Sequence, residues 1–387
     1  MRNFTYHAPT KVLFGKNRIE ELANEIKPFG SSILLAYGGG SIKKSGLHTR
    51  IIELLKAENI KYVELSGIQP NPRIESVREG VRLCRENDVK FILGVGGGSV
   101  IDCIKAISMG VNYQGDAWDF YIRKAKIETV IPIGSVLTLA ATGSEMNGGT
   151  VISNEATQEK RATGHDLLRP KFSILDPTYT FTVSKWQTAA GVVDVMSHIF
   201  EQYFTLDKGT FVQDAMAEGI LKTCIHYGPI LLIEPDNYEA RANLMWASSL
   251  ALNGLTGTGK LYGDWGTHLI EHEVSALYDL THGAGLAILF PVWMEYVINE
   301  NTVAKLAQYA RNVWGVTEAD DERAAKEGIV QTRNFFNSLG MPASLQDVEI
   351  DSKKIPEMAE GACKFGPLGM FKKLDKGDVA AVLQKAL

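Results

Sequence analysis

The sequence predicts a two-domain architecture, in which an α/β domain is followed by an all-α domain. In the first half, short runs rich in β-branched residues alternate with segments of helical apolar spacing, which is typical of a parallel sheet with helices on both faces. From Ser184 onward this strand signal fades and long helical patterns follow. The length of 387 residues also exceeds the size at which one hydrophobic core usually stops growing, so we expect two domains.

Five short apolar runs in the first half are predicted to be strands of one parallel sheet. They cover residues 32–37, 61–65, 91–95, 128–133 and 172–175. The segments between them that keep a helical apolar period, and are predicted to be helices, cover residues 48–57, 74–87 and 99–109. Parallel sheets of this kind bind ligands beyond the carboxyl ends of their strands.

The boundary between the domains is expected just after Asp176-Pro177, which ends the last of these strands. We therefore assign residues 1–181 to a Rossmann-like domain with a parallel sheet and residues 182–387 to an α-helical domain. Further helical patterns in the second domain cover residues 236–253, 303–314 and the tail 349–387.

Glycine-rich stretches follow two of the expected strands. They are Gly38-Gly39-Gly40-Ser41-Ile42-Lys43-Lys44 and Gly96-Gly97-Gly98-Ser99-Val100-Ile101-Asp102. Glycine lets the backbone approach a ligand closely, and the N–H groups at the start of a following helix attract an anion such as a pyrophosphate. The two stretches therefore favour a nucleotide site. Neither matches the G-x-G-x-x-G fingerprint, and a tight strand–helix turn is the alternative interpretation of either stretch alone.

A third polar stretch, residues 138–145, follows the run at 128–133 and is rich in threonine, alanine and glycine. Its hydroxyl groups could bond to a ribose or a nicotinamide. By itself, however, the stretch is more typical of a loop that ends in a cap.

Acidic and histidine residues in the second domain recur at a spacing that suits one metal ion. Asp194 and His198 are four residues apart in a helical segment, and His268 and His272 form a second such pair. Residues at this spacing share one face of a helix. His282 stands at the start of the next apolar run. A helix, a loop and a helix could thus bring Asp194, His198, His268 and His282 together, and three nitrogens with one carboxylate suit first-row divalent metals.

Two competing roles for these histidines stay open at this point. Any single histidine is more often a hydrogen-bonded core or surface residue than a metal ligand. The run His268-Leu-Ile-Glu271-His272 also fits the H-x-x-E-H pattern of zinc peptidases. That pattern leaves Asp194 and His198 without a role, which favours the four-residue site.

The composition argues against several classes of function. The formal charge of −5 and the pI near 6.0, without a block of lysine or arginine, provide no field that would attract nucleic acid. The four cysteines form no C-x-x-C pair, which argues against a disulfide framework and a thiolate zinc site. The amino terminus does not resemble a signal peptide and no apolar run is long enough to span a bilayer, so we expect a cytoplasmic protein without nucleic-acid or membrane partners.

The motifs together resemble those of the iron-containing (group III) alcohol dehydrogenases, and within them the branch of butanol dehydrogenases and NADPH-dependent aldehyde reductases. The resemblance covers essentially the whole chain. It rests on the motifs YGGGSIKK, Pro70-Asn71-Pro72, GGGSVID and LTLAATGSE, on Asp194 with His198, and on the spacing of His268, His272 and His282-Gly283.

This resemblance implies an activity and a set of metal ligands. Asp194, His198, His268 and His282 would bind Fe²⁺, or Zn²⁺ as in some relatives, and His272 would lie beside the metal and help to relay a proton. The chain would transfer a hydride between NAD(P)H and a small aldehyde or primary alcohol, such as butanal and butanol. Family members are typically homodimers, so we expect a homodimer.

The cofactor contacts that the motifs and the resemblance together imply all lie in the first domain. They are Gly38, Gly39, Gly40, Ser41, Lys43, Asn71, Gly96, Gly97, Gly98, Ser99, Asp102, Thr138, Thr142 and Lys160. We expect NADP(H), with NAD(H) as the alternative, because no acid follows Tyr37 to bind a ribose 2′-hydroxyl, whereas Ser41 and Lys43 suit a 2′-phosphate. The competing interpretation is that the lysines of this stretch are solvated surface charges.

A lyase similar to dehydroquinate synthase, which shares this architecture and uses NAD and a metal, is the alternative activity. It would need a pocket rich in lysine and arginine for a polyanionic sugar acid. The segment around the expected ligands is instead mostly apolar, with Trp186, Phe200, Trp265, Leu269 and Val274. This composition favours the dehydrogenase.

Overall fold

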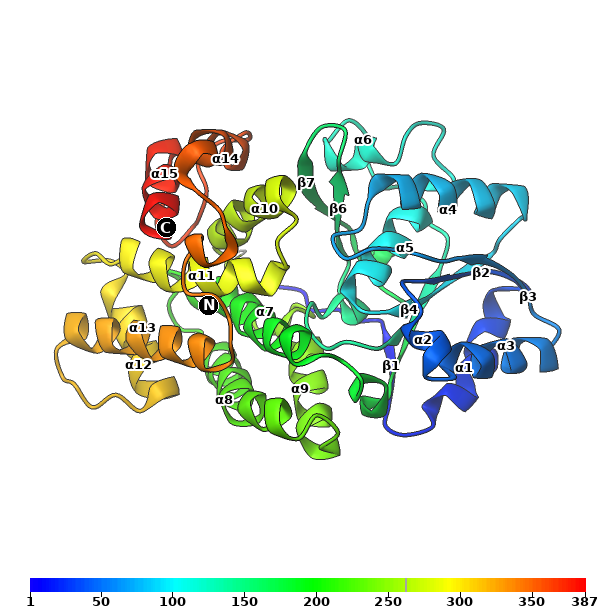
Figure 1. The fold of residues 1–387 in the computed structure, drawn as a ribbon, viewed down its shortest axis with the longest axis horizontal. Helices are drawn as coiled ribbons and strands as arrows, with labels where there is room; N and C mark the ends of the chain where they lie inside the picture. The colour runs from blue at the N-terminus through cyan, green and yellow to red at the C-terminus, as the bar shows by residue number, and fades with distance from the viewer. Residues whose placement is uncertain (262) are drawn as a thin grey trace. The chain divides into compact units, whose positions relative to one another are not determined.

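The computed structural model of the protein describes residues 1–261 and 263–387. The chain forms two compact units (Figure 1), of which one is His7–Thr182 and the other is Val183–Leu387 together with Met1–Tyr6. The first six residues join the second unit because Arg2 bonds to it twice: its N–H donates to the Gly259 carbonyl at 2.9 Å and its guanidinium to Asp207 at 2.7 Å.

The first unit is built on one sheet of six strands. They are β1 (Lys11–Phe14), β2 (Ser32–Tyr37), β3 (Lys61–Leu65), β4 (Phe91–Gly96), β5 (Ile133–Leu137) and β8 (Phe172–Leu175). The spatial order is β1-β8-β5-β4-β2-β3, and every neighbouring pair is parallel. The parallel sheet is therefore confirmed, and so are the expected strands at 32–37, 61–65, 91–95 and 172–175, to within one residue.

The expected strand at residues 128–133 is wrong. The strand in this region is β5, which begins only at Ile133, because residues 133–137 are all buried whereas Glu128 and Thr129 are exposed. Pro132 directly precedes it and has no N–H to donate to a ladder. Strand β1 and the antiparallel hairpin of β6 (Gly149–Asn154) and β7 (Glu159–Gly164) were not predicted from the sequence.

Helices cover both faces of the sheet, as the alternation of the sequence predicts. They are α1 (Leu22–Ile26), α2 (Ser41–Lys44), α3 (Leu47–Ala57), α4 (Ile74–Glu86), α5 (Gly98–Gly110) and α6 (Trp118–Tyr121). α1 and α3 share a core with Ile33 and Leu35 on one face, and α4 and α5 share a core with Leu34 and Ile92 on the other. The expected helices at 48–57, 74–87 and 99–109 are confirmed to within one residue.

The strand order of the sheet reverses at β2. The chain continues from β2 to β3 on one side and then to β4 on the other, and Tyr37 at the end of β2 pairs with Val95 of β4. The glycine stretches that follow β2 and β4 therefore lie side by side. A parallel sheet opens a crevice for a ligand at such a point.

In the described part of the second unit, regular structure is nearly all α-helical. The helices are α7 (Lys185–Tyr203), α8 (Phe211–Ile233), α9 (Tyr238–Ala251), α10 (Gly266–Tyr278), α11 (His282–Tyr296), α12 (Val303–Trp314), α13 (Asp321–Ser338), α14 (Ile355–Ala362) and α15 (Lys376–Lys385). The helix expected at 303–314 is confirmed, and the one expected at 236–253 is two residues shorter at each end. The tail 349–387 is not helical throughout, because Gly366, Pro367 and Gly369 interrupt it between α14 and α15.

One large hydrophobic core holds this unit together, and α7 and α11 run through it. Phe200 of α7 lies 5.3 Å from Phe290 of α11 between ring centroids, and both side chains are fully buried. The helix that carries Asp194 and the helix that begins with His282 are thus anchored in the core.

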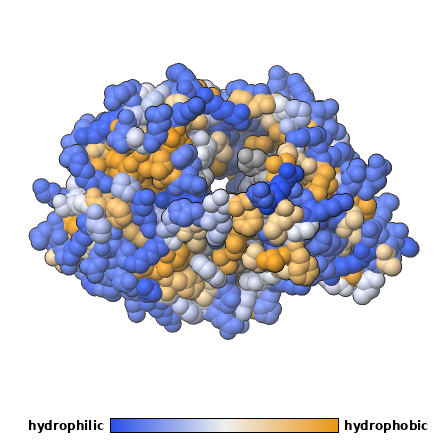
Figure 2. Space-filling model, turned by 180° about the vertical axis from the view of Figure 1, so that it is seen from behind, coloured by the Kyte–Doolittle hydropathy of each residue, from blue (hydrophilic) through white to orange (hydrophobic). Residues whose placement is uncertain are grey.

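The surface is ordinary for a globular protein. Hydrophilic residues cover most of the face in Figure 2, and apolar residues form separate patches on it. Among residues 1–261 and 263–387, no helix combines the length and the apolar character that crossing a membrane requires.

Candidate functional site

The first two expected ligands lie on a buried face of α7. This helix is capped by Ser184, whose hydroxyl accepts a hydrogen bond from the Gln187 N–H at 3.2 Å. Asp194 and His198 follow on the same face, with His198 Nδ1 3.6 Å from Asp194 Oδ1, and both side chains are buried. Local helix geometry thus places a carboxylate oxygen next to an imidazole nitrogen inside the unit.

The other expected ligands come from α10 and the start of α11. α10 is followed by Asp279, which has a left-handed φ of 49°, and a short loop then leads to His282. His282 Nε2 lies 3.7 Å from Asp194 Oδ1. The His268 ring centroid is 4.9 Å from that of His198 and 5.3 Å from that of His282. Ligand atoms of Asp194, His268 and His282 all lie within 4.8 Å of one another.

The four residues fit a first-row divalent metal. Three imidazole nitrogens and one carboxylate oxygen are donors that such metals accept, and metal–ligand bonds of about 2.0–2.2 Å require donors this close together. Burial lowers the pKa of His198 well below its usual value, and the neighbouring His268 and His282 lower it further. The His198 ring is therefore neutral and has a lone pair to donate. The structure brings these residues together, and their role as ligands stays a prediction.

His272 lies one helical turn beyond His268 and is buried beside the cluster. Its ring centroid is 5.7 Å from that of His282, and its ligand atom forms a second close group with those of Glu271 and His282. The Glu271 carboxylate is already engaged by His282 and Ser275, which disfavours this second group as a metal site. His272 therefore lies next to the expected metal position without being one of the four expected ligands.

Two fully buried glutamates bond to the histidines of the cluster. Glu201 Oε1 lies 2.7 Å from His268 Nδ1, and Glu271 bonds to His282 Nδ1. Burial raises the pKa of Glu201, but both of its oxygens accept hydrogen bonds from the backbone N–H groups of His268 and Trp265, which oppose that shift and suit the ionised form. Sequence reasoning missed Glu201, although it lies three residues after His198 on the same helix. It considered Glu271 only within a peptidase pattern.

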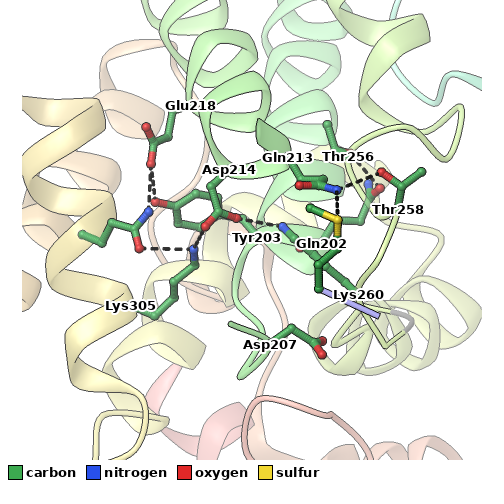
Figure 3. Close-up of polar contacts among 12 residues, drawn as sticks. Gln202, Tyr203, Asp207, Gln213, Asp214, Glu218, Thr256, Thr258, Lys260 and Lys305 are labelled. Carbon is green, nitrogen blue, oxygen red and sulfur yellow. Dashed lines mark hydrogen bonds and ion pairs between the residues drawn. The ribbon is translucent and has the colours of Figure 1, made fainter. Parts of the chain in front are cut away.

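A polar network fastens the end of α7 to the loop that leads into α10 (Figure 3). Gln202 donates hydrogen bonds to the His198 carbonyl and to a carbonyl of α9, both at 2.7 Å. Lys260 donates to the Gln202 carbonyl and to Asp214, both at 2.9 Å, and Lys305 reaches the other oxygen of Asp214 at 2.5 Å. These contacts hold the loop against the helix that carries Asp194 and His198, and so limit how far α10 can move from it.

In the first unit, the structure separates glycines that packing requires from glycines beside open space. A Cβ atom at Gly98 would lie 2.4 Å from Thr142 Oγ1, and one at Gly96 would lie 2.5 Å from a valine side chain. Tight packing therefore accounts for these two positions. A Cβ atom at Gly39 or Gly40 would meet no other described atom within 4 Å, and neither residue has a positive φ. The open space beside β2 is what a bound nucleotide needs.

An acid that the sequence did not suggest lies at the end of β2. Glu64 of β3 accepts a hydrogen bond from the Tyr37 hydroxyl at 2.5 Å and lies 3.0 Å from His48 Nε2. Burial raises the pKa of Glu64, but these two contacts outweigh it, so the net pKa is lowered and the carboxyl is ionised. No acid follows Tyr37 along the chain, as expected, but the Glu64 carboxylate of the neighbouring strand contacts the side chain of this last strand residue. Lys43 Nζ lies over the Tyr37 ring, 5.2 Å from the ring centroid.

Asp102 of α5 belongs to an internal network. Its Oδ1 accepts from the Ser144 hydroxyl at 2.6 Å and its Oδ2 from the Val151 N–H at 2.9 Å. Lys105, one turn further on and fully buried, donates to Ser144 at 2.7 Å, to Asn147 at 3.0 Å and to a backbone carbonyl at 2.8 Å. Burial lowers the pKa of Lys105 to about 8, and the charge of Asp102 opposes that shift. The two charges hold the segment from Ser144 to Val151 against α5. Sequence reasoning missed Lys105.

The other expected cofactor contacts are spread around the same sheet edge. Thr138 directly follows β5, and its N–H bonds to the last residue of β4 at 3.0 Å. Thr142 Oγ1 accepts from the Ser144 N–H at 3.1 Å. Lys160 is buried on β7, and Asn71 has a left-handed φ of 49° in the loop before α4. β5 thus brings Thr138 next to the second glycine stretch. Thr142 and Asn71 lie in loops, and Lys160 lies in the hairpin of β6 and β7.

Comparison with known proteins decides the family. A model described as "Iron-containing alcohol dehydrogenase" matches residues 9–177, and one for the carboxy-terminal part of the "Fe-containing alcohol dehydrogenase family" matches residues 188–387. The chain belongs to the iron-containing alcohol dehydrogenase family. This confirms the resemblance drawn from the motifs and makes the chain an enzyme.

The similar iron-containing alcohol dehydrogenases include proteins of both cofactor types. NADH-dependent butanol dehydrogenase A of Clostridium acetobutylicum is 52% identical over 389 residues, covering 100% of both chains. NADPH-dependent aldehyde reductase YqhD of Escherichia coli is 45% identical over 362 residues, covering 92% of both chains. The crystal structure of NADH-dependent butanol dehydrogenase A from Thermotoga maritima has a TM-score of 0.97 at 42% identity and covers 100% of this chain and 99% of that one. The expected fold class is therefore confirmed.

Family membership favours the dehydrogenase over the peptidase and lyase alternatives.

The apolar residues that were expected around the ligands differ in how far they are exposed. Trp186 and Leu269 are 41% and 36% exposed, whereas Phe200 and Val274 are fully buried in the core. Trp265 lies against the His268 ring, at 5.4 Å between centroids. Only some of these side chains can therefore meet a substrate.

Proposed function

We propose that this chain transfers a hydride between a nicotinamide cofactor and a small aldehyde or primary alcohol, with butanal and butanol as the reference pair. The close group of Asp194, His198, His268 and His282, of which the first three are buried, carries the proposal. The names of its relatives, butanol dehydrogenases and an aldehyde reductase, support this substrate class. Residues 1–181 would bind the cofactor and residues 182–387 the metal.

We infer that Fe²⁺ is the preferred metal and that Zn²⁺ is the alternative. Four protein ligands with a position left for substrate exceed the tetrahedral coordination that zinc favours, and iron accommodates them more readily. When bound, the metal supplies a Lewis acid for the carbonyl or hydroxyl oxygen of the substrate. Asp194 contributes the negative charge of the site, and the neutral His198 ring binds without repelling a cation.

His272 is the residue that we propose to move a proton. It is buried beside His282 and has two ring nitrogens, one of which can accept a proton while the other donates. The alcohol oxygen must gain or lose a proton when the hydride is transferred, so a histidine next to the ligands can accelerate turnover without binding the metal.

We propose NADP(H) as the preferred cofactor. Ser41 and Lys43 offer a hydroxyl and a positive charge next to the open space at Gly39 and Gly40, which suits a 2′-phosphate. Glu64 weakens this preference, because an ionised carboxylate repels a phosphate and accepts from a ribose 2′-hydroxyl. We therefore expect measurable activity with NAD(H), in keeping with relatives that are named for either cofactor.

A steady-state assay of the anaerobically purified, iron-loaded protein tests this function. Straight-chain aldehydes of increasing length are reduced with NADPH and with NADH, and cofactor oxidation is followed. We expect turnover of short aldehydes, butanal among them, with a higher kcat/KM for NADPH. Metal-free protein serves as the control, and equal turnover of metal-free and iron-loaded protein would contradict the proposal.

A further inference from the structure

The two buried glutamates of the candidate metal centre contact ring nitrogens on the side away from the cluster. Glu201 Oε1 is 2.7 Å from His268 Nδ1, and Glu271 bonds to His282 Nδ1. His282 presents its other nitrogen, Nε2, to Asp194 Oδ1 at 3.7 Å. The His282 ring thus has a carboxylate at one nitrogen and the expected metal position at the other. His268 likewise has a carboxylate at Nδ1, and one of its ring nitrogens lies within 4.8 Å of ligand atoms of Asp194 and His282.

Both glutamates are held in place as hydrogen-bond acceptors. The His268 N–H donates to Glu201 Oε1 at 3.1 Å and the Trp265 N–H donates to Oε2 at 2.5 Å. The Ser275 hydroxyl donates to Glu271. Because both side chains are fully buried, bulk water does not compete for their oxygens. Neither carboxylate can turn away from its histidine without leaving a buried donor unpaired.

The position of the proton on a neutral imidazole decides which nitrogen can bind a metal. A carboxylate at Nδ1 accepts the Nδ1–H, so the lone pair is left on Nε2. The same contact orients the ring and makes Nε2 more basic. In the opposite tautomer, Nε2 carries the proton and must lose it before it can become a ligand.

We propose that Glu201 and Glu271 are positioning residues that fix the tautomers of His268 and His282 and thereby set the affinity of the site for its metal. The inference rests on the proposed function, because it takes these histidines to be ligands. It assigns a role to two glutamates that neither bind the metal nor touch the substrate.

The test compares three isosteric substitutions in the second unit. Glu201→Gln and Glu271→Gln keep the size of the side chain but replace one carboxylate oxygen by an NH₂ group. When this NH₂ group faces Nδ1 it donates to that nitrogen, and the ring proton moves to Nε2. Glu218→Gln is the matched control, because Glu218 accepts from Tyr203 at 2.7 Å and its other partners are amides of α12. It loses a carboxylate without changing the surroundings of a histidine.

Zn²⁺ affinity of the metal-free proteins is measured by competition with a chromophoric chelator. We expect a loss of about 10–100-fold for Glu201→Gln and Glu271→Gln, and a change below about twofold for Glu218→Gln. Imidazole ¹⁵N shifts of histidine-labelled, metal-free protein provide a second readout. In Glu201→Gln the His268 signal, assigned with a His268→Ala sample, should change from the Nδ1–H to the Nε2–H form.

Unchanged Zn²⁺ affinity in both variants, or weaker affinity with unchanged tautomers, would overturn the proposal. A wild-type protein that binds neither Zn²⁺ nor Fe²⁺ would overturn the proposed function itself, so the two failures are distinguishable. If urea unfolding shows that Glu201→Gln does not fold, Glu271→Gln and the His282 signal decide the same question.

Discussion

At the scale of single residues, His282 links the parts of the candidate metal centre. Its Nε2 faces Asp194 at 3.7 Å and its Nδ1 bonds to Glu271. His282→Ala removes a donor that no neighbouring side chain replaces, so we expect the protein to lose its metal and its activity together. Elemental analysis of the anaerobically purified variant checks this. Retention of stoichiometric iron would show that His282 is not a ligand.

His272→Ala should have a different outcome. The residue lies beside the cluster, so its loss leaves the four expected donors in place. We expect retained metal and a turnover that is slower by roughly 10²–10⁴-fold, which is typical when a positioned acid–base group is removed. His226→Ala, at an exposed position of α8, is the matched control and should change neither quantity. Loss of metal from the His272 variant would mean that the ligand set is shifted by one turn.

Cofactor choice is also decided by single side chains. Ser41→Asp adds a carboxylate at the first residue of α2, directly after Gly39 and Gly40, where it would repel a 2′-phosphate. We expect the KM for NADPH to rise at least about tenfold, which corresponds to about 1.4 kcal/mol, with a smaller rise for NADH. Ser45→Asp, at an exposed position just after α2, controls for the added charge. Equal rises for the two cofactors, or a wild-type preference for NADH, would refute the NADP(H) assignment.

At the scale of elements, Lys105 joins α5 to the segment that leads into β6. Its ammonium is fully buried and bonds to Ser144, Asn147 and a backbone carbonyl. Lys105→Met removes these three hydrogen bonds and leaves the buried Asp102 without its neighbouring cation, so we expect a loss of roughly 3–5 kcal/mol in the free energy of unfolding. Urea unfolding checks this, with Lys56→Met on the exposed side of α3 as the control. A loss no larger than that of the control would show that the network is dispensable.

The same lysine predicts a pH dependence of stability. Its pKa is about 8 in the folded protein and 10.5 in the unfolded chain. Between these values the unfolded chain holds more protons, so the free energy of unfolding rises with pH, by up to about 1.4 kcal/mol per unit. The difference between wild type and Lys105→Met should therefore grow by about 1.6 kcal/mol from pH 8 to pH 9.5. A difference that stays constant or shrinks over this range would contradict the lowered pKa of Lys105 in the folded protein.

At the scale of the whole molecule, metal binding should appear as stability of the second unit. A ligand that binds only the folded state stabilises it by about 4 kcal/mol at a free concentration one thousand times Kd. The four expected donors lie on α7, α10 and α11, which share one core, so the gain should reach that entire core. We expect chelation to lower the Tm and metal to restore it. A Tm that is independent of added Fe²⁺ or Zn²⁺ would speak against a metal bound in this core.

The sequence by itself determined what depends on neighbouring positions along the chain. Helical and strand periods predicted the elements that bury a continuous apolar face, and the spacing of Asp194 and His198 placed both on one face of α7. The glycine stretches marked the strand ends at Tyr37 and Val95. Each of these signals lies within a short window, because the periods of helix and strand are local properties of the backbone.

Only the tertiary structure decided which distant segments meet. Glu201 bonds to His268 across 67 residues, and Glu64 bonds to Tyr37 across 27, through packing that no local period encodes. The start of β5 at Ile133 and the burial of Lys105 likewise depend on neighbouring strands and loops. A buried polar group is stable only with its partners in place, and those partners are chosen when the core packs.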